Sequence, residues 1–112
     1  MVSTADPGSQ RDARNTAALL VERGIKPVHL VVNRVTRRLL GTVRANVDDM
    51  MDRVGLPLLG LIPEDQNVPA AAAYGEALVL RSRKGAAMAC LRIARRLRGM
   101  DAPLMRVRYW SF

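Results

Sequence analysis

The chain has few of the residues from which covalent cross-links and metal sites are built. Its 112 residues include one cysteine, Cys90, and one histidine, His29. A single cysteine excludes an internal disulfide, and the sequence has no Cys/His cluster with the spacing of a metal site. Cys90 falls within a helical pattern and His29 within a strand pattern. Both residues are therefore predicted to be structural.

Long apolar runs are also missing. No stretch approaches the ~20 apolar residues of a membrane-spanning helix, and no signal peptide pattern opens the chain. Hydrophobic residues make up 49% and charged residues 25%, which is typical of a globular domain rather than a disordered chain. We expect one domain with a modest core in a reducing, cytoplasmic compartment.

Acidic residues are scarce, with 10 against 18 lysines and arginines, which gives a formal net charge of +8. Such an excess suits a phosphate-bearing partner or an anionic membrane. The arginines are nevertheless scattered over predicted helix faces and ends, as expected of a solvated surface or of a coding bias. No basic patch interleaved with aromatics accompanies them, so nucleic acid is not the predicted partner.

Two short apolar runs are the most informative part of the sequence. Val28–Val32 stops at Asn33, and Leu58–Ile62 stops at the turn Pro63-Glu64-Asp65. A helix-like stretch separates the two runs, so the pattern predicts buried, parallel strands of an α/β sheet. Ligands of open α/β sheets bind beyond the carboxyl ends of the strands. Asn33 and the turn are therefore the best candidate site.

Helices are predicted around these strands, and Val2-Ser3-Thr4 is expected to be the stub of a further strand. Asp6 is a good N-cap with Pro7 at the first helical position, and Gly24 ends that helix. The remaining expectations are a loop or irregular helix over Thr36–Arg44, a helix within Asn46–Gly55, one over Asn67–Tyr74, and a last helix capped by Ser82 and ending before Gly99.

The alternation of strands and helices favours a parallel sheet with right-handed crossovers, as in doubly wound folds. Two or three parallel strands leave sheet edges and faces uncovered. We therefore expect an incomplete α/β domain that lacks a part upstream and tends to self-associate.

Several segments carry a resemblance to a known family. They are Val2–Ala13, Leu30–Arg34, Leu58–Val68, Gly75-Glu76 and Ile93–Gly99. In this order and spacing they resemble the C-terminal part of the MinD family of septum-site-determining ATPases, which belongs to the deviant Walker (MinD/ParA) class. The resemblance covers about residues 2–104. It implies that residues 1–104 form the C-terminal segment of a P-loop NTPase-like domain and that residues 105–112 are a divergent tail.

The family is a doubly wound α/β ATPase that dimerises around ATP. Its members bind membrane through a C-terminal amphipathic helix and place the division septum together with MinC and, in some bacteria, MinE. The resemblance thus implies a cytoplasmic protein with peripheral inner-membrane association. Apolar and basic residues in the tail 105–112 alternate at first with the strand period of two, so the tail does not match the family's helix and membrane binding is not predicted from it.

The family's phosphate-binding motif is missing. No Gly-x-x-x-x-Gly-Lys-Ser/Thr occurs, and Lys84-Gly85 does not follow a glycine-rich loop. In the family, this loop and the carboxylates that bind Mg²⁺ lie in the N-terminal half. We therefore predict no catalytic residue here, no tight ATP binding by the chain alone and no hydrolysis by it.

The resemblance places the adenine side of the ATP site in this chain. It implies that Asn33, followed by Arg34, reads the base, and that Pro63, Glu64 and Asp65 form the turn over base and ribose. An asparagine amide offers one acceptor and two donors, which suits the mixed edge of adenine. Alternatively, Asn33 only terminates a strand and Pro63 only stiffens a turn.

Three functions follow as hypotheses. The first is a fragment of a MinD-like ATPase that carries the adenine side of the site and acts in septum placement. The second is a non-enzymatic module that binds a Min partner or the intact ATPase. The third is a fragment of a ParA-type partition ATPase that binds DNA. Asp12, in the first helix, is either a partner contact or an exposed charge.

Overall fold

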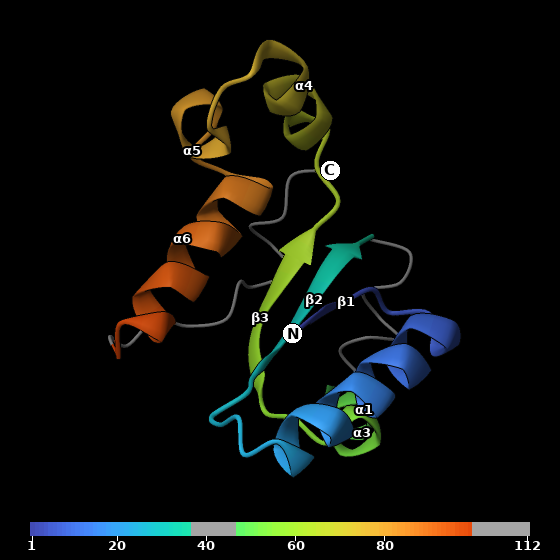
Figure 1. Cartoon of the computed structure of the whole chain (residues 1–112). Helices are drawn as coiled ribbons and strands as arrows, with labels where there is room; N and C mark the ends of the chain where they lie inside the picture. Colours follow the sequence, from blue (N-terminus) through green and yellow to red (C-terminus); the bar gives the residue numbers. More distant parts are fainter. Residues whose placement is uncertain (37–46, 100–112) are drawn as a thin grey trace.

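The structure, a computed structural model, describes residues 1–36 and 47–99 (Figure 1). Along the chain these residues form β1 (Val2–Ser3), α1 (Pro7–Glu22), β2 (Leu30–Val35), α3 (Val47–Val54), β3 (Leu58–Pro63), α4 (Asn67–Tyr74), α5 (Leu78–Arg81) and α6 (Gly85–Leu97). The expected alternation of strands and helices is confirmed.

The three strands form a parallel sheet in the order β1-β2-β3. Helices α1 and α3 lie on one side of this sheet and α6 lies on the other (Figure 1). Helices α4 and α5 lie beyond the carboxyl end of β3. The architecture is the predicted α/β layering: the crossover helices α1 and α3 cover one face, and α6, which follows the last strand, lies on the other.

The core lies between the sheet and α1. Leu30 and Val32 of β2 have no exposed surface and pack with Ala13 and Ala17 of α1 in one apolar cluster. The two alanines share a helix face at the i, i+4 spacing. Their small side chains leave room for the branched residues of the strand, so the helix can lie close to the sheet.

The start of α1 forms as predicted. The Asp6 side chain accepts a hydrogen bond from the Ser9 N–H at 3.0 Å, and Pro7 occupies the first turn. The helix ends at Glu22, and Gly24 follows with a φ of 72°. Glycine adopts this left-handed conformation without steric cost.

The second strand differs from the prediction. β2 begins at Leu30 rather than Val28 and continues to Val35 rather than stopping at Val32. Asn33 and Arg34 therefore lie inside the strand. The apolar run was an incomplete guide because the last part of β2 is held by backbone pairing with β3, where Val35 stands opposite Pro63.

The predicted cap of the last helix is wrong. α6 begins at Gly85, and the Ser82 hydroxyl accepts instead from the Lys84 N–H at 3.2 Å. The Ala86 N–H, in the first turn of α6, donates to Asp65 at 3.1 Å. The expectations for residues 37–44, for Asn46 and for the tail 105–112 lie outside the described residues.

Candidate functional site

Asn33 and Arg34 form an irregularity in β2. Val32 pairs with Leu61 and Val35 pairs with Pro63, so two residues of β2 stand opposite one residue of β3. Such a β-bulge re-aims the side chains of the bulged strand. Arg34 has a φ of 56°, which is rare for a residue other than glycine. The bulge lies at the carboxyl end of the sheet, where ligands of α/β folds bind.

The Asn33 side chain lines a hollow of about 360 Å³ at this end of the sheet. That volume is at the lower end of the range for small-molecule pockets, roughly 300–1,000 Å³. The polar residues of its lining are Ser3, Thr4, Ser9, Asp12, Thr16 and Asn33. β1, β2 and the first half of α1 thus bring their polar side chains to one place.

The Asn33 amide is half-buried. It has no hydrogen-bond partner within residues 1–36 and 47–99. An amide that is only half-buried and has no protein partner can exchange hydrogen bonds with water for hydrogen bonds with a ligand at little cost in free energy. Its donors and acceptor therefore remain available to a molecule bound in the hollow.

Thr4, Asp6 and Ser9 form a polar network beside the hollow that the sequence prediction missed. The Thr4 hydroxyl bonds the Asp6 carboxylate and lies 2.8 Å from the Ser9 Oγ. The Thr4 hydroxyl, followed by the backbone N–H and hydroxyl of Ser9, lowers the pKa of Asp6 from 3.8 to about 2. The sequence indicated only the Asp6 cap, because the placement of Thr4 and Ser9 beside Asn33 requires β1 and β2 to be neighbours.

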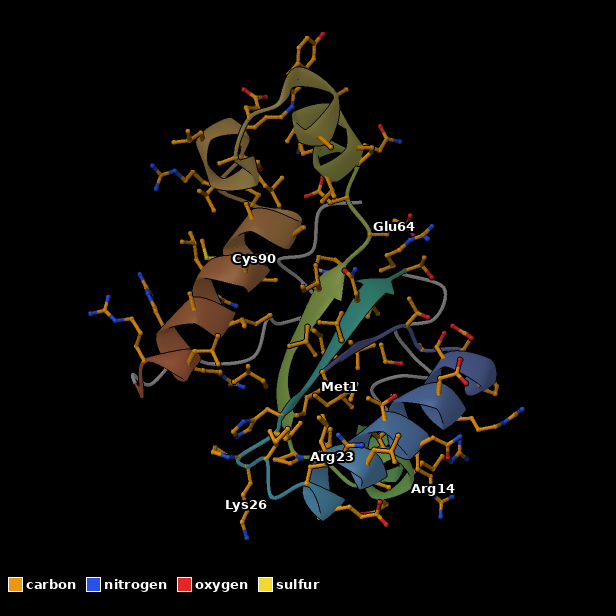
Figure 2. All side chains as sticks on the ribbon, viewed as in Figure 1. Met1, Arg14, Arg23, Lys26, Glu64 and Cys90 are labelled. Carbon is orange, nitrogen blue, oxygen red and sulfur yellow. The ribbon has the colours of Figure 1, made fainter. Side chains whose placement is uncertain are left out.

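Arg34 and Glu64 face each other across the ends of β2 and β3. The Arg34 Nη2 and Glu64 Oε1 are 3.4 Å apart, and both side chains are largely exposed. The Glu64 N–H also donates to the Val35 carbonyl at 2.8 Å. Figure 2 shows Glu64 just beyond the carboxyl end of β3, whereas Arg23 and Lys26 lie at the opposite end of the sheet. Arg34 and Glu64 thus pair with each other at the carboxyl end of the sheet.

Pro63 and Asp65 take structural positions. Pro63 is fully buried at the end of β3. The Asp65 carboxylate accepts from the Asn67 N–H at 2.9 Å and from the Ala86 N–H at 3.1 Å. Both oxygens of Asp65 are therefore engaged by the starts of α4 and α6.

The five candidates do not converge on one point. Asn33 faces the hollow beside α1, Arg34 and Glu64 pair on the surface, and Pro63 and Asp65 hold the turn. Within the part of the chain that the structure describes, no group of three or more His, Cys, Asp or Glu side chains could hold a metal ion. None of the described helices is long and apolar enough to cross a membrane.

Comparison with known proteins identifies similar chains. No family model matches the sequence. The septum site-determining protein MinD of Synechocystis sp. is 32% identical over 107 residues, which are 94% of this chain and 40% of that protein. The MinD cell division protein of Aquifex aeolicus superposes with a TM-score of 0.83 at 30% identity, over 94% of this chain and 45% of its own.

The MinD chain of an Aquifex aeolicus MinC:MinD complex gives a TM-score of 0.84 at 29% identity, over 98% of this chain and 45% of that chain. This chain thus spans less than half the length of each of these relatives. Sequence and fold agree over nearly all of its own length, and the chain belongs to the MinD family, corresponding to the C-terminal part of those proteins.

Proposed function

We propose that this chain supplies the adenine-binding side of a MinD-type ATP site. The observation that carries the proposal is the Asn33 amide, which faces a hollow at the carboxyl end of the sheet without a hydrogen-bond partner among the described residues. Adenine presents an amino donor beside a ring-nitrogen acceptor. One amide side chain satisfies both with its own acceptor and donor.

The remaining candidates have supporting roles in this proposal. Pro63, being buried, shapes the turn, and Asp65 fixes that turn to the starts of α4 and α6. Arg34 and Glu64 form the exposed rim. The Arg34 and Glu64 side chains can then approach the ribose or the base only from this rim. Selectivity for the base therefore rests chiefly on Asn33.

The phosphates and Mg²⁺ belong to the part of a MinD protein that has no counterpart here. The chain has no glycine-rich phosphate loop, and such a loop supplies the backbone N–H groups and lysine that hold the phosphates. We therefore propose that this chain reads the base and that hydrolysis requires the complementary part.

The biological role we propose is septum-site determination as part of a MinD-type ATPase. The relatives carry that function in their names, and one solved relative is in a complex with MinC. MinC is therefore the proposed partner. Homodimerisation, an interaction with MinE and peripheral membrane association are proposals that rest on the family alone.

The test is a chimera in which this chain replaces the matched 107 residues of the Synechocystis relative. Asn33→Ala should remove the two neutral hydrogen bonds to adenine. At about 0.5–1.5 kcal/mol for each bond, ATP affinity should fall about 5- to 150-fold. GTP affinity should change much less, because the phosphate contacts are shared.

The matched control is Asn15→Ala, which removes an exposed amide from α1. It should leave the ratio of ATP to GTP affinity unchanged. If Asn33→Ala lowers the melting temperature but also leaves that ratio unchanged, Asn33 is a structural residue of the strand and the proposal is wrong.

A further inference from the structure

The positive charge of the chain is concentrated in one segment. Residues 77–99, which contain α5 and α6, hold seven arginines and lysines and no aspartate or glutamate. The other 89 residues hold 11 basic and 10 acidic residues, a net charge of +1. Nearly all of the formal charge of +8 therefore lies on these two helices and the residues next to them. The excess that looks scattered along the sequence belongs to one part of the fold.

Two of the seven cations are already engaged. The Arg81 Nη1 lies 2.6 Å from the Glu76 Oε1, and the Arg81 guanidinium lies over the Tyr74 ring, 5.3 Å from its centroid. Arg96 donates to the Leu59 carbonyl at 3.0 Å. The other five cations have no carboxylate partner within residues 1–36 and 47–99. These five form the basic face: Arg83, Lys84, Arg92, Arg95 and Arg98.

The helical part of the basic face points away from the sheet. Arg92, Arg95 and Arg98 follow one another at the i, i+3 spacing, which places them along one side of α6. Ala86 and Ala89, on the opposite side of this helix, are buried. Figure 2 shows nitrogen-tipped side chains that project from α6 away from β3. Elements that cover the rest of the sheet therefore leave this face in solvent.

The five cations are electrostatically unfavourable without an anion. Like charges three or four positions apart destabilise a helix, as between Arg92 and Arg95. Lys84 lies at the N-terminal end of α6, where the helix dipole disfavours a cation. An anionic partner turns both effects into attraction. Four of the five cations are arginines, whose planar guanidinium binds a carboxylate through two parallel hydrogen bonds.

We propose that the basic face binds an acidic, extended segment of a partner protein. The 13 residues of α6 make a helix about 20 Å long. An extended chain advances about 3.3 Å per residue, so about six residues run along this length, and every second side chain faces the same way. A segment with acidic residues at alternate positions therefore directs its carboxylates at the cations near both ends of α6.

Two features favour a protein segment over other anions. Met88 and Leu91 of α6, between the cations in sequence, are half-buried, so the face offers little apolar surface for insertion into a bilayer. Asp65 and Glu76 border its N-terminal end, where they bond the first turn of α6 and the last residue of α5. A nucleic-acid duplex is a long, densely charged rod that extends beyond one helix, so its phosphates meet these carboxylates. A short acidic segment ends before them.

The test measures the binding of a fluorescein-labelled peptide, six Glu-Ser repeats long, to the full chain by fluorescence anisotropy without nucleotide. Binding should saturate in about 50 mM NaCl and weaken at least tenfold in about 500 mM NaCl, because salt screens exposed charges. A labelled peptide of six Gln-Ser repeats should not bind. The result is independent of the base pocket, because none of the five cations lines the hollow beside Asn33.

Two double variants locate the binding surface. Arg92→Gln with Arg95→Gln, and Arg83→Gln with Lys84→Gln, each remove two positive charges from the basic face. Each should weaken peptide binding at least fivefold with an unchanged far-UV circular dichroism spectrum. The second pair lies before the first residue of α6, so it tests the face even if the first pair disturbs the helix.

The matched control is Arg11→Gln with Arg14→Gln, which removes two exposed arginines at the same i, i+3 spacing from α1. It should bind the peptide as the parent does. Equal weakening by this control would show that the peptide responds to net charge alone and would overturn the proposal. Absence of binding at low salt, or binding that neither double variant weakens, would also overturn it. Tighter binding of a DNA duplex or of phosphatidylglycerol vesicles than of the peptide would assign the face to phosphates instead.

Discussion

The carboxylate of Asp65 accepts a hydrogen bond from the backbone N–H of Ala86 at 3.1 Å, across 21 positions of sequence. Its other oxygen accepts from the Asn67 N–H at 2.9 Å. One side chain thus satisfies donors at the starts of both α4 and α6, where backbone N–H groups have no intrahelical acceptor. A negative charge is also favourable at the positive end of a helix dipole. Asp65 therefore ties the turn after β3 to α6.

Asp65→Ala should lower the free energy of unfolding by about 1–4 kcal/mol, because removing each of the two caps costs about 0.5–2 kcal/mol. Asp65→Asn keeps one acceptor oxygen and should cost less. Urea unfolding followed by circular dichroism measures both variants. Asp52→Ala, at an exposed position of α3, is the control and should stay within about 0.5 kcal/mol of the parent. Equal effects of Asp65→Ala and Asp52→Ala would contradict the double-cap interpretation.

The backbone of Arg34 supports a second prediction. Arg34 has a φ of 56°, a conformation that glycine adopts without a Cβ clash. Arg34→Gly should therefore raise the free energy of unfolding by up to about 1 kcal/mol. Arg34→Val should lower it by about 1–2 kcal/mol, since a β-branched residue is least tolerated there. Glu64→Gln removes the same exposed ion pair without changing the backbone, and should cost less than about 1 kcal/mol. A valine variant as stable as the glycine variant would show that the bulge is not strained.

Close packing between β3 and α6 gives a third prediction. A Cβ atom on Gly60 would overlap the Cγ1 and Cδ1 atoms of Ile93, so Gly60→Ala should cost about 1–3 kcal/mol of stability. The same change in an Ile93→Ala background should cost less, because the space is then free. The difference between the two costs is the coupling energy of the pair.

Gly8→Ala is the control for glycine removal. A Cβ at Gly8 meets only the Asp6 Oδ2 at 3.5 Å, which is an ordinary contact, and alanine is the better helix former by up to about 1 kcal/mol. Gly8→Ala should therefore be neutral or stabilising. If Gly60→Ala behaves in the same way, α6 does not lie as close to β3 as the structure places it.

The sequence predicted those parts of the fold that depend on local pattern. The apolar run from Leu58, the cap at Asp6 and the stop at Gly24 each act through neighbours in the chain, and each was found at or within a residue of its predicted place. The resemblance to the MinD family implied part of a doubly wound α/β fold, which the parallel sheet and the superposition on a solved MinD chain confirm.

The parts that sequence reasoning missed depend on distant residues. The cap of α6 comes from Asp65 rather than from the nearby Ser82. The continuation of β2 through Asn33 and Arg34 depends on its register with β3. The grouping of Asp12 and Thr4 with Asn33 around one hollow requires β1 and β2 to be neighbours. No local pattern carries these relationships.

A fourth prediction concerns pH. The hydrogen bonds from Thr4 and Ser9 lower the pKa of Asp6 from 3.8 to about 2 in the folded chain. Because the folded pKa is below the unfolded one, the ionised carboxylate contributes stability above about pH 3.8, and this contribution is lost as the pH falls toward 2. Between these values the unfolded chain binds more protons at this position. The free energy of unfolding should therefore decrease with falling pH in this window.

Asp6→Asn isolates this contribution, because asparagine also caps helices but does not titrate. Its free energy of unfolding should fall less steeply than that of the parent between pH 4 and 2, and the other carboxylates, which both proteins share, cancel in the comparison. Asp6→Ala should likewise lose the pH dependence and should in addition be less stable than Asp6→Asn at pH 7, because the Ser9 N–H loses its acceptor. Urea titrations at half-unit pH intervals measure both effects. Parallel curves for the parent and Asp6→Asn over this window would show that the Asp6 carboxylate is not held ionised by Thr4 and Ser9.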